Sequence, residues 1–204
     1  MDYSLFYNYK LIGDILMIVF NNDEISTRNE KKDEDVVFIY NKDKLIGINI
    51  FNFSKIVKIK AKGLIVLPSD ELINIINNIL SKYEIKLPYK KESGFKIGKI
   101  ISLEEHPESN HLHLLKVDIG SEVLDIVCGA SNVALNQYVV VATLNTMMFN
   151  GETIKKSSLL GYESYGMCCS ERELNLTNDP QKRGLLILDD TYKLGEDFFK
   201  VYKQ

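Results

Sequence analysis

Apolar residues in the first ninety positions of the chain recur in short runs that are separated by turn-forming residues. The runs are rich in Ile, Val, Phe and Tyr, and Gly13 or Asn-containing turns stand between them. This pattern is typical of strands in an antiparallel sheet. The expected strands lie in residues 4–10, 14–20, 35–41 and 45–53. The stretch 22–35 is polar and highly charged, which predicts a mobile loop.

One segment of this half has the spacing of a helix. Ser69 is a candidate N-cap, and Asp70 and Glu71 follow in the first turn, where carboxylates complement the helix dipole. Apolar residues then recur at helical spacing, at Leu72, Ile73, Ile75, Ile76, Ile79 and Leu80. We therefore expect an α+β unit with one clear helix.

Pro, Gly, Ser and charged residues cluster at 87–94, and the apolar pattern restarts at Phe95. Such a composition is typical of a linker, and a chain of 204 residues is long enough for two small domains. We expect an N-terminal accessory domain over residues 1–89 and a second domain over residues 90–204.

The second half has mostly the pattern of strands. Leu115, Val117 and Ile119 would face inward, with Lys116 and Asp118 facing outward. Several short strands with small helices inserted indicate a small Greek-key barrel, and the five-stranded oligonucleotide-binding (OB) barrel is one such architecture. The predicted fold class is α+β, mostly β. The expected strands lie in residues 96–105, 113–119, 124–129, 137–144, 153–160 and 184–190.

Net charge limits how this chain could bind nucleic acid. The whole chain carries −3. Residues 1–95 hold 14 Lys and Arg against 13 Asp and Glu, a balance of +1, and residues 96–204 hold 11 against 15, a balance of −4. Binding to nucleic acid must therefore depend on a local basic patch and not on the field of the whole domain.

Composition also indicates where the protein works. The three cysteines form neither a disulfide framework nor a zinc ligand set, which is typical of a reducing compartment. The longest apolar run, Ile15 to Phe20, is too short to span a bilayer. We expect a cytoplasmic protein with no membrane partner.

The most distinctive stretch is GYESYGMCCSERELNL at 161–176. Gly161 and Gly166 bracket a polar turn, and Ser170 with Glu173 forms a capping box that predicts a short helix. Two further blocks precede this stretch, HPESNHLHLLKVDIG at 106–120 and IVCGASNV at 126–133.

Together with IGKI at 97–100 and RGLLILDD at 183–190, these blocks resemble the tRNA-binding OB-fold module. That module occurs at the start of the bacterial phenylalanyl-tRNA synthetase β chain and at the end of many methionyl-tRNA synthetases. The resemblance covers nearly all of 95–200, and the N-terminal half is similar to the extra domain of the YtpR-type tRNA-binding proteins. It implies a non-catalytic accessory protein that recognises tRNA by shape and backbone, and not a synthetase.

The chain departs from the family pattern at two places. Ser109-Asn110-His111 stands where Ala-Asp-Lys is usual, and Ser158-Leu159-Leu160-Gly161 stands where Lys-Leu-Arg-Gly is common. Two expected cations are thus a serine and a leucine, and each missing phosphate contact weakens binding. The alternative function is a protein–protein interaction module of the translation machinery with weakened or lost tRNA binding.

Nine residues are candidates for contact with tRNA. The cations would meet phosphate oxygens, and Lys182 and Arg183 would extend the patch if the fold brings them onto the same face. Tyr165 is the best candidate for stacking on a base. The nine are Lys155, Lys156, Asn132, Ser164, Tyr165, Met167, Ser170, Arg172 and Lys99.

Most of these candidates also fit a purely structural role. The lysine pair fits a solvated strand end, and the glutamates beside Arg172 would repel phosphate. The structural roles open to five more are an Asx turn for Asn132, a helix cap for Ser170, a contact within the fold for Ser164, core packing for Met167 and rim packing for Tyr165.

Neither catalysis nor a metal site is expected. His106, His111 and His113 lack a recognisable ligand partner, and Cys168 and Cys169 lack the His and Asn of a nucleophilic site. We therefore expect no enzyme and no cofactor. The expected partners are tRNA or another structured RNA, a second copy that doubles the contacts, and a translation factor or synthetase.

Overall fold

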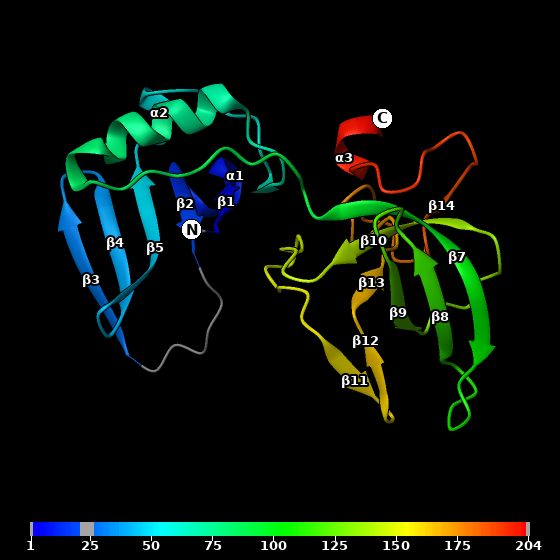
Figure 1. Cartoon of the computed structure of the whole chain (residues 1–204). Coiled ribbons are helices and arrows are strands. Elements are labelled where there is room, and N and C mark those ends of the chain that lie inside the picture. The colour runs from blue at the N-terminus through cyan, green and yellow to red at the C-terminus, as the bar shows by residue number, and fades with distance from the viewer. Residues whose placement is uncertain (1, 21–26, 203–204) are drawn as a thin grey trace. The chain divides into compact units, whose positions relative to one another are not determined.

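The computed structural model describes residues 2–20 and 27–202 (Figure 1). The chain divides into two compact units, residues 1–91 and residues 92–204. Antiparallel strands dominate both units, and the described residues include three α-helices. The mostly β fold class that the sequence predicts is confirmed.

The N-terminal unit is one antiparallel sheet that is covered by a helix. Its strand order is β3-β4-β5-β2-β1-β6, and helix α2 (Asp70–Leu80) packs across the strands (Figure 1). The strands are β1 (Ser4–Tyr7), β2 (Ile15–Val19), β3 (Arg28–Asp33), β4 (Val36–Asn41), β5 (Lys44–Phe51) and β6 (Gly63–Ile65). The short helices are α1 (Tyr9–Ile12), η1 (Phe53–Lys55) and η2 (Ser81–Tyr83).

Helix α2 forms as its sequence predicts. Ser69 caps it, because its hydroxyl accepts a hydrogen bond from the Leu72 backbone N–H at 3.2 Å. Leu72, Ile73, Ile76 and Leu80 are buried in a core with the inward face of the sheet. The helix is thus held by its apolar stripe as well as by its cap.

The loop predicted at 22–35 is wrong over strand β3. This strand pairs antiparallel with β4 along its whole length, from Arg28 opposite Asn41 to Asp33 opposite Val36. All six of its side chains are exposed, so no apolar alternation marks it as a strand. It lies at the sheet edge, where charged side chains are favoured because they oppose pairing with another chain. Residues 22–26 of the predicted loop lie outside the described residues.

The C-terminal unit is a five-stranded barrel with the topology of an OB fold. The strands follow the order β13-β10-β7-β8-β9, and β13 lies against β9. The Tyr165 backbone N–H donates to the Asp125 carbonyl at 2.9 Å, which helps to close the barrel. The strands are β7 (Phe95–Glu105), β8 (His113–Asp118), β9 (Val123–Cys128), β10 (Tyr138–Thr143) and β13 (Gly166–Cys168).

The barrel encloses an apolar core. Leu115, Val117 and Ile119 are buried and Lys116 is exposed, so the alternation that the sequence predicts for this strand is confirmed. Two predicted strands are much shorter than expected. Only β11 (Ser157–Leu159) forms within 153–160, and only β14 (Ile187–Leu188) forms within 184–190.

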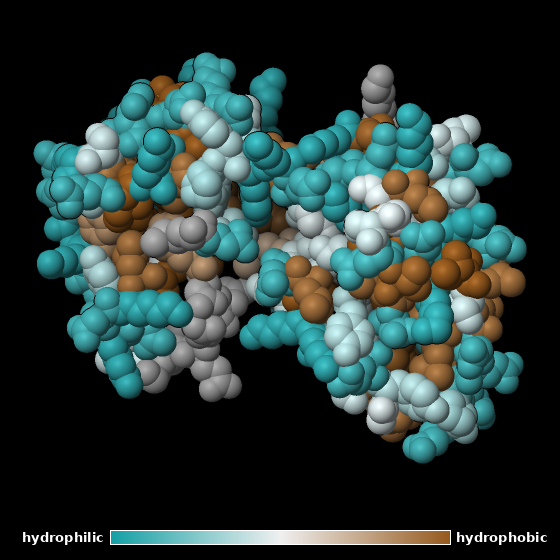
Figure 2. All heavy atoms as spheres, viewed as in Figure 1, coloured by the Kyte–Doolittle hydropathy of each residue, from teal (hydrophilic) through white to brown (hydrophobic). Residues whose placement is uncertain are grey.

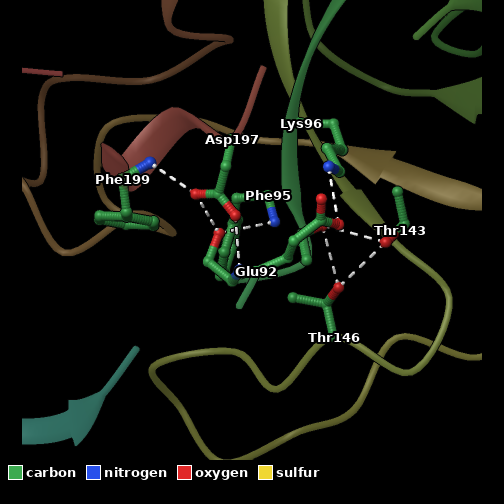
Figure 3. Close-up of polar contacts among 9 residues, drawn as sticks. Glu92, Phe95, Lys96, Thr143, Thr146, Asp197 and Phe199 are labelled. Atoms are coloured by element: carbon green, nitrogen blue, oxygen red, sulfur yellow. Dashed lines mark hydrogen bonds and ion pairs between the residues drawn. The ribbon is translucent and has the colours of Figure 1, made fainter. Parts of the chain in front are cut away.

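The two ends of this unit are joined by a buried carboxylate. Asp197, at the start of α3 (Phe198–Val201), accepts hydrogen bonds from the Ser93 backbone N–H at 2.5 Å and the Ser93 hydroxyl at 2.8 Å. It also accepts one from the Phe199 backbone N–H (Figure 3). The neighbouring Gly94 carbonyl accepts from the hydroxyls of Thr143 and Thr146. The predicted linker region therefore contributes buried contacts to the barrel.

Candidate nucleic-acid interface

The glycine-bracketed motif forms a hairpin that extends from the barrel. Strand β11 pairs with β12 (Tyr162–Ser164) through a two-residue turn at Leu160 and Gly161. Their φ angles are +45° and +84°, as a type I′ turn requires. Leu160 and Tyr162 are 53% and 40% exposed, so the tip of the hairpin presents apolar surface.

The capping box forms, but the helix predicted after it does not. The Glu173 carboxylate accepts from the Ser170 backbone N–H at 2.6 Å and from its hydroxyl at 2.7 Å. The Leu174 N–H then bonds the Ser170 carbonyl, which completes one turn. Asn175 has φ +55°, a conformation that ends the helical geometry at once. Ser170 is therefore a turn cap.

An open groove of about 770 Å³ lies beside this turn. The ends of β9 and β13, the loop after β10 and the segment 170–185 line it. We call it the arginine groove. Its lining residues include Asn150, Glu152, Ile154, Met167, Ser170, Arg172, Glu173, Asn178, Lys182 and Arg183. Three of the nine predicted site residues, Met167, Ser170 and Arg172, thus come together here, and Lys182 and Arg183 join them.

The cations of the arginine groove differ in how they are paired. The Lys182 ammonium lies 2.8 Å from the Glu171 carboxylate, and this contact raises its pKa. Within the described ranges, neither Arg172 nor Arg183 forms an ion pair. Both guanidinium groups are therefore available to an anionic ligand. Arginine also stays charged at any physiological pH, so this availability does not depend on pH.

Two predicted site residues, Lys156 and Tyr165, meet Glu163, which was not predicted, at the β11–β12 hairpin. We call Lys156, Glu163 and Tyr165 the hairpin cluster. The Lys156 ammonium lies 2.5 Å from a Glu163 oxygen and 5.0 Å from the centre of the Tyr165 ring. The Tyr165 hydroxyl donates to the other Glu163 oxygen at 2.5 Å. The contacts with Glu163 and then Tyr165 raise the pKa of Lys156, and the contact with Lys156 lowers that of Glu163.

Ser164 and Asn132 make contacts that hold the barrel together. The buried Ser164 hydroxyl accepts from the Val127 N–H and donates to the Gly166 carbonyl, both at 3.1 Å. The Asn132 side chain bonds both the N–H and the carbonyl of Leu185, at 2.8 and 3.0 Å. Asn132 thus fastens the segment that carries Arg183 to the barrel, a contact between residues far apart in sequence.

Two predicted lysines lie outside these clusters. The Lys99 ammonium is 5.4 Å from the centre of the Tyr138 ring. Lys99 lines neither the arginine groove nor a second groove, which we call the hairpin groove and whose lining includes Glu104, Lys116, Asp125, Tyr162, Glu163 and Tyr165. Lys155 is exposed and directly follows Ile154, which lines the arginine groove. Lys155 therefore links the arginine groove to the hairpin cluster along the chain.

Tyr162 and Asn150 are not among the nine predicted site residues, although Tyr162 belongs with Tyr138 and Tyr165 to the aromatic residues expected near the binding face. Tyr162 contacts His106 edge to face, with ring centres 4.8 Å apart, and it lines the hairpin groove of about 330 Å³. Asn150 lies in the long loop after β10 and reaches the arginine groove from there. The position of Tyr162 within the distinctive motif is the one sequence signal that could have indicated it. No local sequence signal indicates Asn150.

The described residues contain neither a group of metal-ligating side chains nor a membrane-spanning helix. No group of three or more His, Cys, Asp and Glu side chains in residues 2–20 and 27–202 is placed to hold a metal ion. Within the same ranges, no helix has the length and apolar character needed to cross a membrane.

Comparisons with known proteins identify both halves of the chain. Residues 95–197 match the family model described as "Putative tRNA binding domain", and residues 23–88 match a "Domain of unknown function (DUF4479)". The chain is 36% identical to "Putative tRNA-binding protein YtpR" of Bacillus subtilis, over 96% of this chain and 98% of that protein.

Two other relatives differ in how much of their length is matched. The "Uncharacterized protein MG449 homolog" of Mycoplasma pneumoniae is 31% identical over 91% of this chain and 80% of its own length. The phenylalanine–tRNA ligase beta subunit of Nitratidesulfovibrio vulgaris is 45% identical over 55% of this chain, but the match spans only 14% of that subunit. The family-model match and the near full-length similarity therefore place this chain in the YtpR family, and residues 95–197 belong to the family described as "Putative tRNA binding domain".

Proposed function

We propose that this protein is a non-catalytic, cytoplasmic RNA-binding protein that recognises tRNA by its backbone and shape. The ligand would lie along the arginine groove and continue past Lys155 toward the hairpin. The observation that carries this proposal is a pair of arginines, Arg172 and Arg183, that line one open groove without an acidic partner among the described residues. Arginine forks match phosphate oxygens in geometry as well as in charge.

The rest of the groove is mixed in character. Asn178 supplies an amide that bonds ribose or phosphate oxygens, and Met167 offers apolar surface. The Asn150 amide is bonded to Glu152 at 2.8 Å, and Glu152 and Glu173 also line the groove, so the ligand must pass these carboxylates. None of these groups reads a base sequence in a fixed way, so recognition would depend on the shape of a folded RNA. The names of the relatives, which refer to tRNA binding and to a tRNA ligase subunit, support tRNA as that RNA.

The charge of the C-terminal unit limits the affinity. Residues 96–204 carry 11 Lys and Arg against 15 Asp and Glu, a balance of −4, so the long-range field repels RNA. Binding then depends on a few short-range contacts, and the fall in affinity with salt scales with their number. A homodimer would raise the affinity because a second module doubles those contacts.

Binding of bulk tRNA to filters tests the proposal directly. We expect Arg172→Gln/Arg183→Gln to weaken tRNA binding about tenfold at low salt, and to reduce the slope of log affinity against log salt by about 2. The control is Lys58→Gln/Lys60→Gln, because it also removes two positive charges, at exposed positions of the N-terminal unit that line neither groove. An arginine variant that binds like the wild type, or binding that is insensitive to salt, would contradict the proposal.

The hairpin tip favours a second candidate function. Leu159, Leu160 and Tyr162 are 38%, 53% and 40% exposed on one short hairpin, and Figure 2 shows hydrophobic residues reaching the visible surface of this unit. Exposed apolar side chains that are close together are typical of protein docking sites. A translation factor or synthetase would be the partner in this case. Salt-insensitive capture of such a protein, lost in Leu160→Ser, would favour this function.

A further inference from the structure

We infer that Glu163 limits the affinity for tRNA by occupying the donor groups that a phosphate of the ligand would take. This inference rests on the proposed function, because it concerns the contribution of Lys156 to the same RNA surface. It assigns to Glu163 the part of an intramolecular competitor for the ligand.

The geometry of the hairpin cluster is that of a bound anion. One Glu163 oxygen faces the Lys156 ammonium and the other accepts the Tyr165 hydroxyl proton, each at 2.5 Å. An ammonium and a hydroxyl that converge on two oxygens of one group are also the contacts made by two oxygens of a phosphate. The carboxylate therefore stands where a backbone phosphate would bind.

The cluster is open enough for an exchange of anions. The Lys156 and Glu163 side chains are 49% and 52% exposed, and Glu163 lies on the short strand β12 at the edge of the hairpin groove. Ion pairs with this exposure are weak, so a phosphate can displace the carboxylate. The displaced Glu163 would nevertheless remain on the adjacent strand and repel the phosphate.

The other predicted RNA-binding cations differ from Lys156 in their ion pairing. Lys155 is exposed and, like Arg172 and Arg183, forms no ion pair within the part of the chain that the structure describes. These three can engage RNA without first losing a partner. Lys156 can contact a phosphate only after its ion pair with Glu163 breaks. Removing the Glu163 charge should therefore leave the Lys156 ammonium free to bind RNA.

The test compares Glu163→Gln with Glu104→Gln in the full chain. Glu104 lines the same groove and forms no ion pair among the described residues. It acts on Lys116 only at longer range, and Lys116 keeps its 2.7 Å contact with Asp125 when Glu104 is neutralised, so this variant removes one negative charge without releasing a paired lysine. We expect Glu163→Gln to bind bulk tRNA more tightly than Glu104→Gln. We also expect its slope of log affinity against log salt to steepen by about 0.9, so that its advantage shrinks about threefold between roughly 50 and 200 mM salt.

A double-mutant cycle assigns the gain to Lys156. In a Lys156→Met background, Glu163→Gln should give no more than the effect of Glu104→Gln. Equal gains from Glu163→Gln and Glu104→Gln, or a full gain without Lys156, would overturn the inference. Both outcomes differ from failure of the proposed function, in which the wild type shows no salt-dependent binding or the arginine variant binds normally. Unchanged thermal unfolding of the single variants controls for folding.

Discussion

At the scale of single residues, one carboxylate organises the start of the N-terminal unit. Asp14 accepts hydrogen bonds from the Ser54 backbone N–H at 2.8 Å, the Ser54 hydroxyl at 2.6 Å and the Tyr7 hydroxyl at 2.9 Å. Burial by itself raises the pKa of Asp14, but the bonds from Ser54 and Tyr7 outweigh it, and the pKa lies below its usual value of 3.8. The ionised form is thus favoured by folding.

Replacement of this carboxylate should destabilise the N-terminal unit. We expect Asp14→Ala to lower the free energy of unfolding by about 2–3 kcal/mol at neutral pH, because three donors lose a charged acceptor. A carboxylate with a lowered pKa stabilises the fold above the unfolded-state pKa, and this contribution is lost as the pH falls through the folded-state pKa. The difference between wild type and variant should therefore shrink below about pH 4.

Urea unfolding at several pH values measures this difference. Asp43→Ala, at an exposed turn position, is the matched control and should leave the unfolding free energy nearly unchanged at every pH. A penalty for Asp14→Ala that stays constant down to pH 2 would show that the charge of Asp14 contributes nothing.

At the scale of elements, strand β3 illustrates how an edge is kept soluble. Its backbone pairs with β4, while its six exposed residues, Arg28–Asp33, leave neither face apolar. Glu30 and Lys32 lie opposite Ile39 and Val37, on the side of the ribbon away from Phe38. Charges at such positions oppose edge-to-edge pairing with another chain.

Removing these charges should therefore promote self-association. We expect Glu30→Val/Lys32→Val to form oligomers that grow with concentration, because an alternating apolar edge strand is a template for further pairing. Size-exclusion chromatography with light scattering measures the effect. Glu30→Gln/Lys32→Gln removes the same charges without adding apolar surface, and it should remain at the size of the wild type. Equal association of both variants would assign the effect to charge alone.

The elements also show which features the sequence could predict. Helix α2 was predictable because Ser69 and the apolar stripe are local signals, and β8 because Leu115 and Val117 alternate with exposed residues. Strand β3 was not, since its pairing depends on backbone hydrogen bonds that leave no apolar pattern. At the site, the Asn132–Leu185 contact joins residues 53 apart, and only the path of the chain after Arg172 brings Arg183 to the groove that Arg172 also lines.

At the scale of the whole molecule, the fold places a few of the cations of the C-terminal unit together in one groove. The C-terminal half is acidic, and several of its lysines are already paired, as Lys116 is with Asp125 and Lys182 with Glu171. Arg172 and Arg183, which form no ion pair in residues 2–20 and 27–202, both line the arginine groove. Placement, and not total charge, therefore decides whether this unit can bind an anionic polymer.

The Ser93–Asp197 contact gives a prediction about the limits of the C-terminal unit. A fragment of residues 90–204 retains Ser93 and should fold cooperatively. A fragment of residues 95–204 leaves the buried Asp197 carboxylate without two of its donors, and it should lose about 3 kcal/mol of stability or fail to fold. Thermal unfolding monitored by circular dichroism distinguishes the two. Equal stability would mean that the contact is dispensable.

The same contact has a consequence for how such a unit can be reused. Because Ser93 and Asp197 are bonded directly, the polypeptide enters and leaves the barrel at nearly one point. A domain whose chain enters and leaves at one point can be fused to the terminus of another protein, or inserted into one of its surface loops, without distorting either fold. The position of these two chain ends therefore suits transfer of the barrel between proteins as one piece.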